Sequence, residues 1–264
     1  MSFRRWVALV VFPLFGCSVP ARQPSAVRLV AREYTFDLPD TIPAGLVQIT
    51  LVNGGTDLHE ALITRLDGDS ASAVHYVDSV RAHITFPAFA HDLGGPGLLL
   101  PGDSATVWLE LKPGRYAVVC WMGDHLERGM ARDLIVTGAS SPSASPPSAE
   151  STIELNNYAF GQDRTLRQGR QVIQIVNRGN EFHEAGLFRL PDGVSAEDEL
   201  RWLDTETGPS PGASAGGIGD IPAGDSILVA LDLKPGRYLW FCSVRDAAGT
   251  PHYRLGMVSQ FKIE

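Results

Sequence analysis

The sequence predicts an all-β protein made of two tandem Greek-key β-sandwiches, each with a short helical insertion. Two observations lead to this prediction. First, the chain of 264 residues repeats itself at a period of about half its length, which indicates a duplicated domain rather than a solenoid of short repeats. Second, short stretches of alternating or β-branched apolar residues in each half are separated by turn residues, as in antiparallel sandwiches.

The repeat is visible at four places in each half. It includes a polar segment that contains a His-Glu pair and a hexapeptide that precedes a lone cysteine. The matched segments are VNGGTDLHEA at 52–61 with VNRGNEFHEA at 176–185, YTF at 34–36 with YAF at 158–160, GDS at 102–104 with 224–226, and LKPGRY at 111–116 with 233–238.

Composition predicts the limits of the two domains. Residues 138–150 form a Ser/Pro/Ala-rich run without apolar periodicity, which is typical of an extended linker. Residues 17–26 have a similar composition and are expected to act as a tether. We therefore expect domain 1 over residues 27–137 and domain 2 over residues 151–264.

Each half carries the same succession of expected elements. The segment 46–52 alternates apolar and polar residues through its middle, as a half-buried strand does. Ser195 and Asp198 form a capping-box pattern before a short apolar run, which predicts a helix there, and its counterpart is expected at about 70–80. The other expected strands are 172–176, 105–111, 227–233, 116–120 and 238–242, the last two each following a Pro-Gly turn.

The N-terminus predicts an exported lipoprotein. Residues 1–16 have the plan of a signal peptide, with Arg4 and Arg5 before an apolar run at 6–15 that is too short to span a bilayer. The run ends in LFGC, which resembles the lipobox of bacterial lipoproteins and makes Cys17 the expected lipidation site. The protein would then be anchored to a bacterial membrane and face the periplasm or the cell exterior. The alternatives are an ordinary signal peptide with a chance cysteine, or a transmembrane anchor.

Charge and composition exclude some classes of function. The formal net charge is −8 at an isoelectric point of about 5.4, which argues against nucleic-acid binding. Hydrophobic residues make up 44% of the chain and charged residues 20%, as in a globular protein. We expect contact with a membrane through the lipid anchor only.

One cysteine per half remains once Cys17 is set aside. These are Cys120 and Cys242. An exported protein usually pairs its cysteines, so two unpaired ones need another role, and metal ligation is one. A Cys120–Cys242 disulfide is the alternative, although it would join equivalent positions of two separate folded units.

Each of these cysteines opens a Cys-x-His-x-Met succession. The spacing is Cys-x4-His-x4-Met in the first half and Cys-x9-His-x4-Met in the second, and another histidine follows an earlier strand in each half. Two imidazoles, one thiolate and a weak axial thioether are the ligands of a mononuclear electron-transfer copper site. Taken singly, each residue could instead be a core or surface side chain. The predicted metal ligands are His59, Cys120, His125 and Met130, and then His183, Cys242, His252 and Met257.

At these residues the chain resembles the cupredoxin family, the plastocyanin- and azurin-like type 1 blue copper proteins. The first loop resembles that of rusticyanin-type cupredoxins, and the second is similar in length to the copper loop of two-domain nitrite reductases. The resemblance implies one type 1 copper per half and exchange of single electrons with redox partner proteins that the sequence does not name. The second loop must fold back to place His252.

One position departs from the family pattern. The first histidine of each set is followed by Glu60 or Glu184, where cupredoxins often have Asn or a small residue. The carboxylate could reach the second nitrogen of the imidazole and raise its basicity. Alternatively, it could be a solvated charge at the rim of the site.

The neighbours of the cysteines argue against an enzyme. Multicopper oxidases and copper nitrite reductases have a histidine beside the copper cysteine that bridges to another copper. Here the neighbours are Val119 and Trp121, then Phe241 and Ser243, and no His-x-His motif occurs. We therefore expect an electron carrier rather than an enzyme. The alternatives are a cupredoxin-fold binding or structural module without redox copper, or copper sequestration or delivery, which the scarcity of methionines disfavours.

Overall fold

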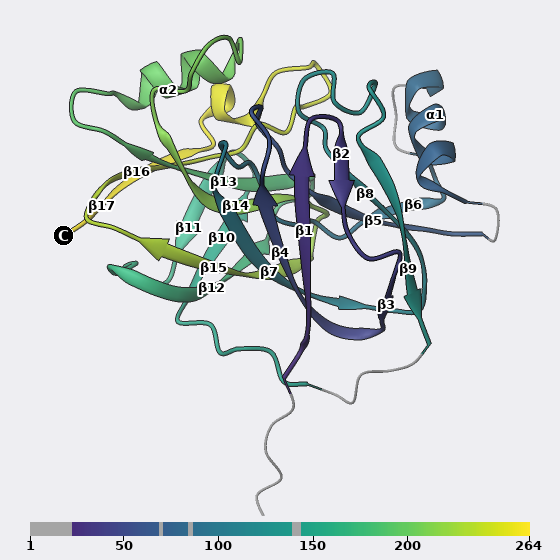
Figure 1. Cartoon of the computed structure of the whole chain (residues 1–264). Helices are drawn as coiled ribbons and strands as arrows, with labels where there is room; N and C mark the ends of the chain where they lie inside the picture. Colours follow the sequence, from purple (N-terminus) through teal and green to yellow (C-terminus); the bar gives the residue numbers. More distant parts are fainter. Residues whose placement is uncertain (1–22, 69–70, 84–86, 139–143) are drawn as a thin grey trace, which may run out of the picture.

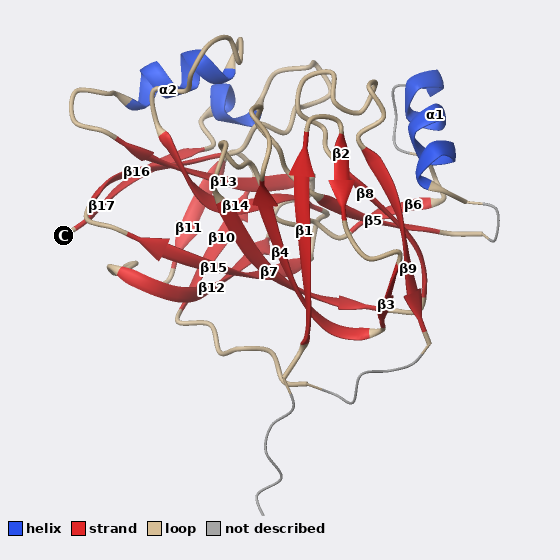
Figure 2. Cartoon of the chain, in the orientation of Figure 1, coloured by secondary structure: helices blue, strands red, loops and turns tan. Residues whose placement is uncertain are grey.

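A computed structural model describes residues 23–68, 71–83, 87–138 and 144–264. The expected signal peptide, Cys17 and the first part of the tether lie outside the described residues, as do residues 139–143 of the expected linker. The described chain is built mainly of strands, with two α-helices at its periphery (Figure 2). The predicted all-β class with short helical insertions is thereby confirmed. In these residues no helix combines the length and the apolar character needed to cross a membrane.

The elements follow one another in a similar order in the two halves (Figure 1). Those of the first half are β1 (Ser25–Arg32), β2 (Thr35–Asp37), β3 (Thr41–Pro43), β4 (Gly45–Asn53), β5 (Leu62–Leu66), α1 (Ala73–His83), β6 (Ala90–Asp92), β7 (Ser104–Leu111), β8 (Gly114–Val119) and β9 (Ala131–Thr137). Those of the second half are β10 (Ser151–Asn156), β11 (Ala159–Gln162), β12 (Gly169–Asn177), β13 (His183–Leu190), α2 (Ala196–Leu203), β14 (Ala213–Ile221), β15 (Ser226–Leu233), β16 (Gly236–Phe241), the 3-10 helix η1 (His252–Leu255) and β17 (Val258–Ile263).

The helices show how local sequence sets the boundaries. At the start of α2, the backbone N–H of Asp198 donates to Ser195 Oγ at 3.1 Å and the N–H of Ser195 donates to Asp198 Oδ2 at 3.0 Å. This is the predicted capping box. The first helix begins later than expected, at Ala73, because Ser72 accepts the N–H of His75 at 3.1 Å and so takes the capping position.

One sheet of eight strands runs through both halves. Its order is β11-β10-β12-β15-β7-β4-β1-β2, and the antiparallel pair β15–β7 joins the two halves. Each half has its own second sheet, β3-β9-β8-β5-β6 in the first and β14-β13-β16-β17 in the second. The buried core contains side chains from both layers, such as Ile49 of β4 with Val118 of β8, and Ile175 of β12 with Trp240 of β16. Each half is therefore a sandwich of two packed sheets.

A second connection between the halves runs through residues 94–99. On one side, the N–H of Ala61 donates to Pro96 O at 3.0 Å, and the N–H of Leu99 donates to His59 O at 2.8 Å. On the other side, the N–H of Gly97 donates to Gly217 O of β14 at 3.3 Å. The segment between β4 and β5 that carries His59 is thus linked by hydrogen bonds, through 94–99 and β14, to β13, which begins at His183.

Glycine makes this connection close enough to form. A Cβ atom on Gly95 would lie 2.0 Å from Ala61 O, and one on Gly217, whose φ is +114°, would lie 2.2 Å from Ala185 O. No other residue fits at such distances without moving a backbone. The composition of the linker left the arrangement of the halves open, whereas the structure joins them along both layers.

Candidate metal centres

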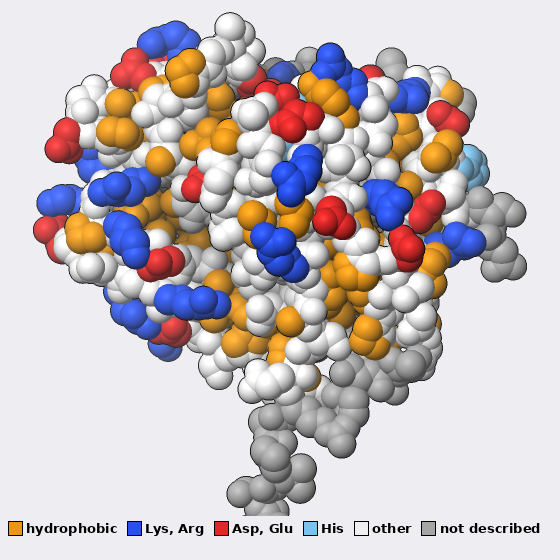
Figure 3. All heavy atoms as spheres, in the orientation of Figure 1, with side chains coloured by type: hydrophobic (Ala, Val, Ile, Leu, Met, Phe, Trp, Pro, Cys, Tyr) orange, Lys and Arg blue, Asp and Glu red, His pale blue; other side chains and the backbone are white. Residues whose placement is uncertain are grey.

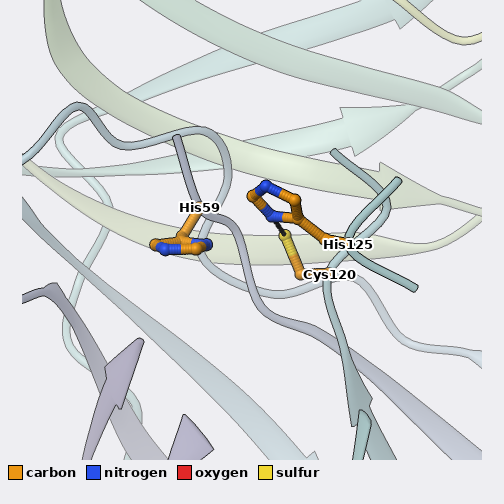
Figure 4. Close-up of side chains that lie close together, drawn as sticks. All are labelled: His59, Cys120 and His125. Carbon is orange, nitrogen blue, oxygen red and sulfur yellow. Dashed lines mark hydrogen bonds between the residues drawn. The ribbon is translucent and has the colours of Figure 1, made fainter. Parts of the chain in front are cut away.

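The first cluster brings together His59, Cys120 and His125 (Figure 4). Their potential ligand atoms all lie within 4.8 Å of one another. His59 pairs with Leu99 beyond the end of β4, Cys120 directly follows β8, and His125 lies in the loop before β9. The sulfur of Cys120 is 3.4 Å from His125 Nδ1, and the three residues are 0%, 0% and 7% exposed.

The second cluster, His183, Cys242 and His252, forms a tighter triangle. His183 Nδ1 is 3.1 Å from His252 Nδ1, and Cys242 Sγ is 3.9 Å from the first nitrogen and 3.5 Å from the second. All three residues are fully buried. Metal–ligand bonds of about 2.0–2.3 Å place donor atoms roughly 3–4 Å apart, so these distances fit three ligands around one ion.

The longer second loop folds back through a closed turn. The N–H of Asp246 donates to Thr250 O at 3.0 Å, and Asp246 Oδ1 accepts the N–H of Ala248 at 2.9 Å. Arg245 and Pro251, on either side of this turn, pair with each other. The additional residues therefore project as a self-contained turn, and His252 starts η1 close to Cys242.

Met130 and Met257 occupy equivalent buried positions. Each is 0% exposed, and the N–H of each donates to the carbonyl of the loop histidine, His125 or His252, at 2.9 Å. Both belong to the buried core cluster that contains the two cysteines. The two predicted methionines therefore have matching backbone contacts and burial in the two halves.

The buried nitrogens fit a bound cation. Among the described residues neither ring nitrogen of His59 has a hydrogen-bond partner, although buried polar groups are normally satisfied. In the second cluster, Asn157 Oδ1 lies 3.3 Å from His183 Nε2 and can accept its proton. The lone pair of His183 Nδ1 then faces His252 Nδ1, and a metal between them satisfies both.

Burial sets the protonation of these groups in the absence of metal. It lowers the pKa of His59 and of His183 to about 4, so both imidazoles are neutral. It raises the pKa of Cys120 to about 12 and that of Cys242 well above its usual value. Both cysteines are free thiols rather than a disulfide. Soft sulfur together with neutral imidazole is a donor set that fits copper.

Glu60 and Glu184 bind the backbone next to the cysteines. The sequence suggests either contact with an imidazole or a solvated charge at the rim of the site. The side chain of Glu60 is buried, and its Oε1 accepts the N–H of Trp121 at 3.1 Å. In the second half, Glu184 Oε1 accepts both the N–H of Ser243, at 2.5 Å, and its hydroxyl, at 2.5 Å. Each carboxyl therefore holds the peptide that follows the cysteine, instead of contacting an imidazole or lying in solvent at the rim. The signal was present in the sequence, because the His-Glu pair recurs in both halves.

We expect Glu184→Ala to lower both the stability of the protein and the metal affinity of the second centre. The substitution removes the acceptor of two Ser243 donors, which should lower the free energy of unfolding by about 1–3 kcal/mol. Loss of such a supporting contact typically weakens metal binding about 10–100-fold. Denaturant unfolding and a metal titration measure the two effects. Glu184→Gln keeps an acceptor oxygen and is the matched control, so equal behaviour of the Ala and Gln variants would contradict the role of this contact.

Comparison with known proteins gives remote similarities only. No family model and no curated protein matches the chain. Among solved structures, dithionite-reduced auracyanin from Roseiflexus castenholzii is 22% identical, covers 43% of this chain and 97% of its own, and has a TM-score of 0.33. Auracyanin A, a blue copper protein from Chloroflexus aurantiacus, is 19% identical over 44% and 100% of the two chains, with a TM-score of 0.33. A copper-containing nitrite reductase from Thermus scotoductus SA-01 is 13% identical over 90% and 61%, with a TM-score of 0.24. At these TM-scores the similarities do not indicate a function for this chain.

Proposed function

We propose that this protein is a copper-binding electron carrier of the cupredoxin type with one type 1 site in each half. The observation that carries the proposal is the second triangle, in which one sulfur and two imidazole nitrogens lie 3.1–3.9 Å apart in a fully buried setting. Copper bound there supplies one-electron chemistry between Cu(I) and Cu(II). The protein supplies a soft thiolate, two neutral imidazoles and a core that excludes water and limits rearrangement.

The proposed ligands come from three strands or loops in each half. Two imidazoles and a thiolate form the trigonal plane, and a buried methionine supplies the axial sulfur. In domain 1 (27–137) they are His59, Cys120, His125 and Met130, and in domain 2 (151–264) they are His183, Cys242, His252 and Met257. Export, lipidation of Cys17 and placement in the periplasm or at the cell exterior complete the proposal and rest on the N-terminal sequence.

A carrier is favoured over an oxidase or reductase by the residues beside the cysteines. None of Val119, Trp121, Phe241 and Ser243 is a histidine that could bridge to a further copper. The face of the molecule in Figure 3 carries basic and acidic side chains interspersed among apolar ones. Such a mixed surface supports transient protein partners rather than nucleic acid.

Titration with Cu(II) tests the proposal. Metal-free protein comprising residues 18–264 should take up two Cu(II) ions per chain and turn intensely blue, because a thiolate–copper bond gives a strong visible charge-transfer band. Absorption spectra and metal analysis of the desalted product measure colour and stoichiometry. A colourless product without stoichiometric copper would contradict the carrier function and favour the binding or structural module.

A further inference from the structure

A cavity of about 660 Å³ lies between the two halves. It is lined by five carboxylic side chains, two from the His-Glu pairs and three from the second half near α2 and β14, and by Trp121 and Tyr253. Its volume falls in the range of small-ligand sites, roughly 300–1,000 Å³. The carboxylic residues are Glu60, Glu184, Asp204, Glu206 and Asp220. Asp204 is already engaged, because it is ion-paired with Arg254 and accepts the hydroxyl of Tyr253 at 2.9 Å.

The four carboxyls other than Asp204 have no ion-pair partner in the described chain. None of the ion pairs that lie within 4.0 Å involves any of the four. Arg245 also lines the cavity, and its guanidinium donates to Gly249 O at 2.7 Å. Among the described residues it forms no hydrogen bond to a carboxylate, although its charge counteracts the rise that burial causes in the pKa of Glu206. Buried carboxyls without a counter-ion hold their protons, and a cation that enters beside them stabilises their ionised form. This cavity therefore favours a cationic ligand.

Glu60 points to the ligand most directly. Its side chain is 6% exposed, and only one of its oxygens has a donor, the N–H of Trp121. The other oxygen has no hydrogen bond among the described residues, although the side chain lines the cavity. Asp220 also lines it, and among the described residues its carboxyl is hydrogen-bonded only to its own backbone. Carboxyl oxygens that can still accept hydrogen bonds in one cavity suit a ligand with several N–H donors.

The spacing of the carboxylates disfavours a directly coordinated metal. The only groups of three or more ligand atoms within 4.8 Å of one another in the described chain are the two His-Cys-His clusters. No three of the carboxyls therefore lie close enough together to surround one ion. A longer cation with charges at its two ends can reach separate carboxylates, and its methylene chain can lie against the rings of Trp121 and Tyr253.

We propose that this cavity binds a small aliphatic diamine or polyamine. The formal net charge of −8 adds a long-range attraction for such cations. The ammonium groups are held by Glu60 and Asp220, with Glu184 and Glu206 beside them. Binding requires no copper, so the proposal stands apart from the electron-carrier function and can be tested on metal-free protein.

Calorimetric titration of metal-free protein with 1,4-diaminobutane tests the proposal. We expect saturable binding of one molecule per chain, and none by 1,4-butanediol, which has the same chain length without charge. Asp220→Asn should weaken the binding at least tenfold, whereas Glu110→Gln, at an exposed position of β7 outside the cavity, should leave it unchanged. Absence of saturable diamine binding, or equal weakening by the two substitutions, would overturn the proposal.

Two further measurements test whether the cavity binds a diamine rather than a metal ion. Glu206→Gln changes an exposed cavity residue and should also weaken diamine binding, so that the result does not depend on a buried substitution. Titration with MgCl2 should give no stoichiometric binding, and tight Mg²⁺ binding in place of diamine binding would assign the cavity to a metal instead. Diamine binding by protein that fails to take up copper would overturn the electron-carrier function alone.

Discussion

Cys120→Ser and Cys242→Ser should each abolish one of two thiolate–copper absorption bands and lower the copper content from two ions per chain to one. The visible band needs an ionised sulfur bonded to copper, and a serine hydroxyl neither ionises at neutral pH nor supplies a soft donor. The double variant should be colourless. Both cysteines are fully buried and have no disulfide partner, so serine, which is of similar size, should preserve the fold.

The same variants should change the number of protons that copper displaces. Without metal the thiol of each site is protonated, because burial raises its pKa, to about 12 for Cys120. The imidazoles of His59 and His183 are already neutral, since burial lowers their pKa to about 4. Copper uptake at pH 7 should therefore release two protons per chain in the wild type and one in each single variant, and copper affinity should rise with pH.

Calorimetry in two buffers with different ionisation enthalpies counts these protons. Met122→Leu is the matched control, because Met122 is partly buried against the core cluster that contains both cysteines and belongs to neither proposed ligand set. It should retain both bands and both protons. Loss of both bands on replacing a single cysteine, or loss of neither, would contradict two independent thiolate sites.

Asp220→Asn should stabilise the metal-free protein at alkaline pH. Burial, reinforced by the neighbouring Asp92 and Glu184 carboxylates, raises the pKa of Asp220 from 3.8 to about 8. A raised carboxyl pKa means that the folded state holds the proton more tightly than the unfolded state. The stabilisation this provides is complete below pH 4 and is lost as the pH rises towards 8. Asparagine is neutral throughout and avoids this loss.

We expect the gain to be about 1–3 kcal/mol at pH 8 and to vanish near pH 4. The full shift would correspond to roughly 5–6 kcal/mol, but Asp220 retains partial solvent contact and shares its titration with Asp92, so the gain is smaller. Urea unfolding at several pH values in the absence of amines measures it. Asp232→Asn, at an exposed position paired with Lys234, should change stability by less than about 0.5 kcal/mol. A variant of Asp220 that is less stable than the wild type at pH 8 would contradict this account.

Much of the fold could be predicted because its signals are local. The alternation at 46–52 identifies β4, and Ser195 with Asp198 identifies the start of α2. The lone cysteine that follows each LKPGRY segment also leads to the observed clusters, because a strand that ends at Cys120 or Cys242 places the cysteine beside the loop histidine. These inferences need only the period of a strand and the chemistry of a few side chains.

What could not be predicted depends on contacts between distant segments. Strands β7 and β15 look like ordinary half-buried strands, and nothing in either shows that their free edges pair with each other. The role of Glu60 was missed for a geometric reason. Successive side chains of an extended segment point to opposite faces, so a residue next to His59 points away from the metal cluster and towards the other half of the chain.

The hydrogen-bonded segment 94–99 has a consequence for how this protein could change during evolution. A newly duplicated domain is dispensable, because either copy can be lost without harm to the other. Here the loss of one copy would expose the edge of β7 or β15, and also the glycine-lined edge at Gly95 or Gly217. Exposed strand edges promote aggregation. Neither copy can therefore be lost without exposing strand edges of the other, because each half covers the edges of its neighbour.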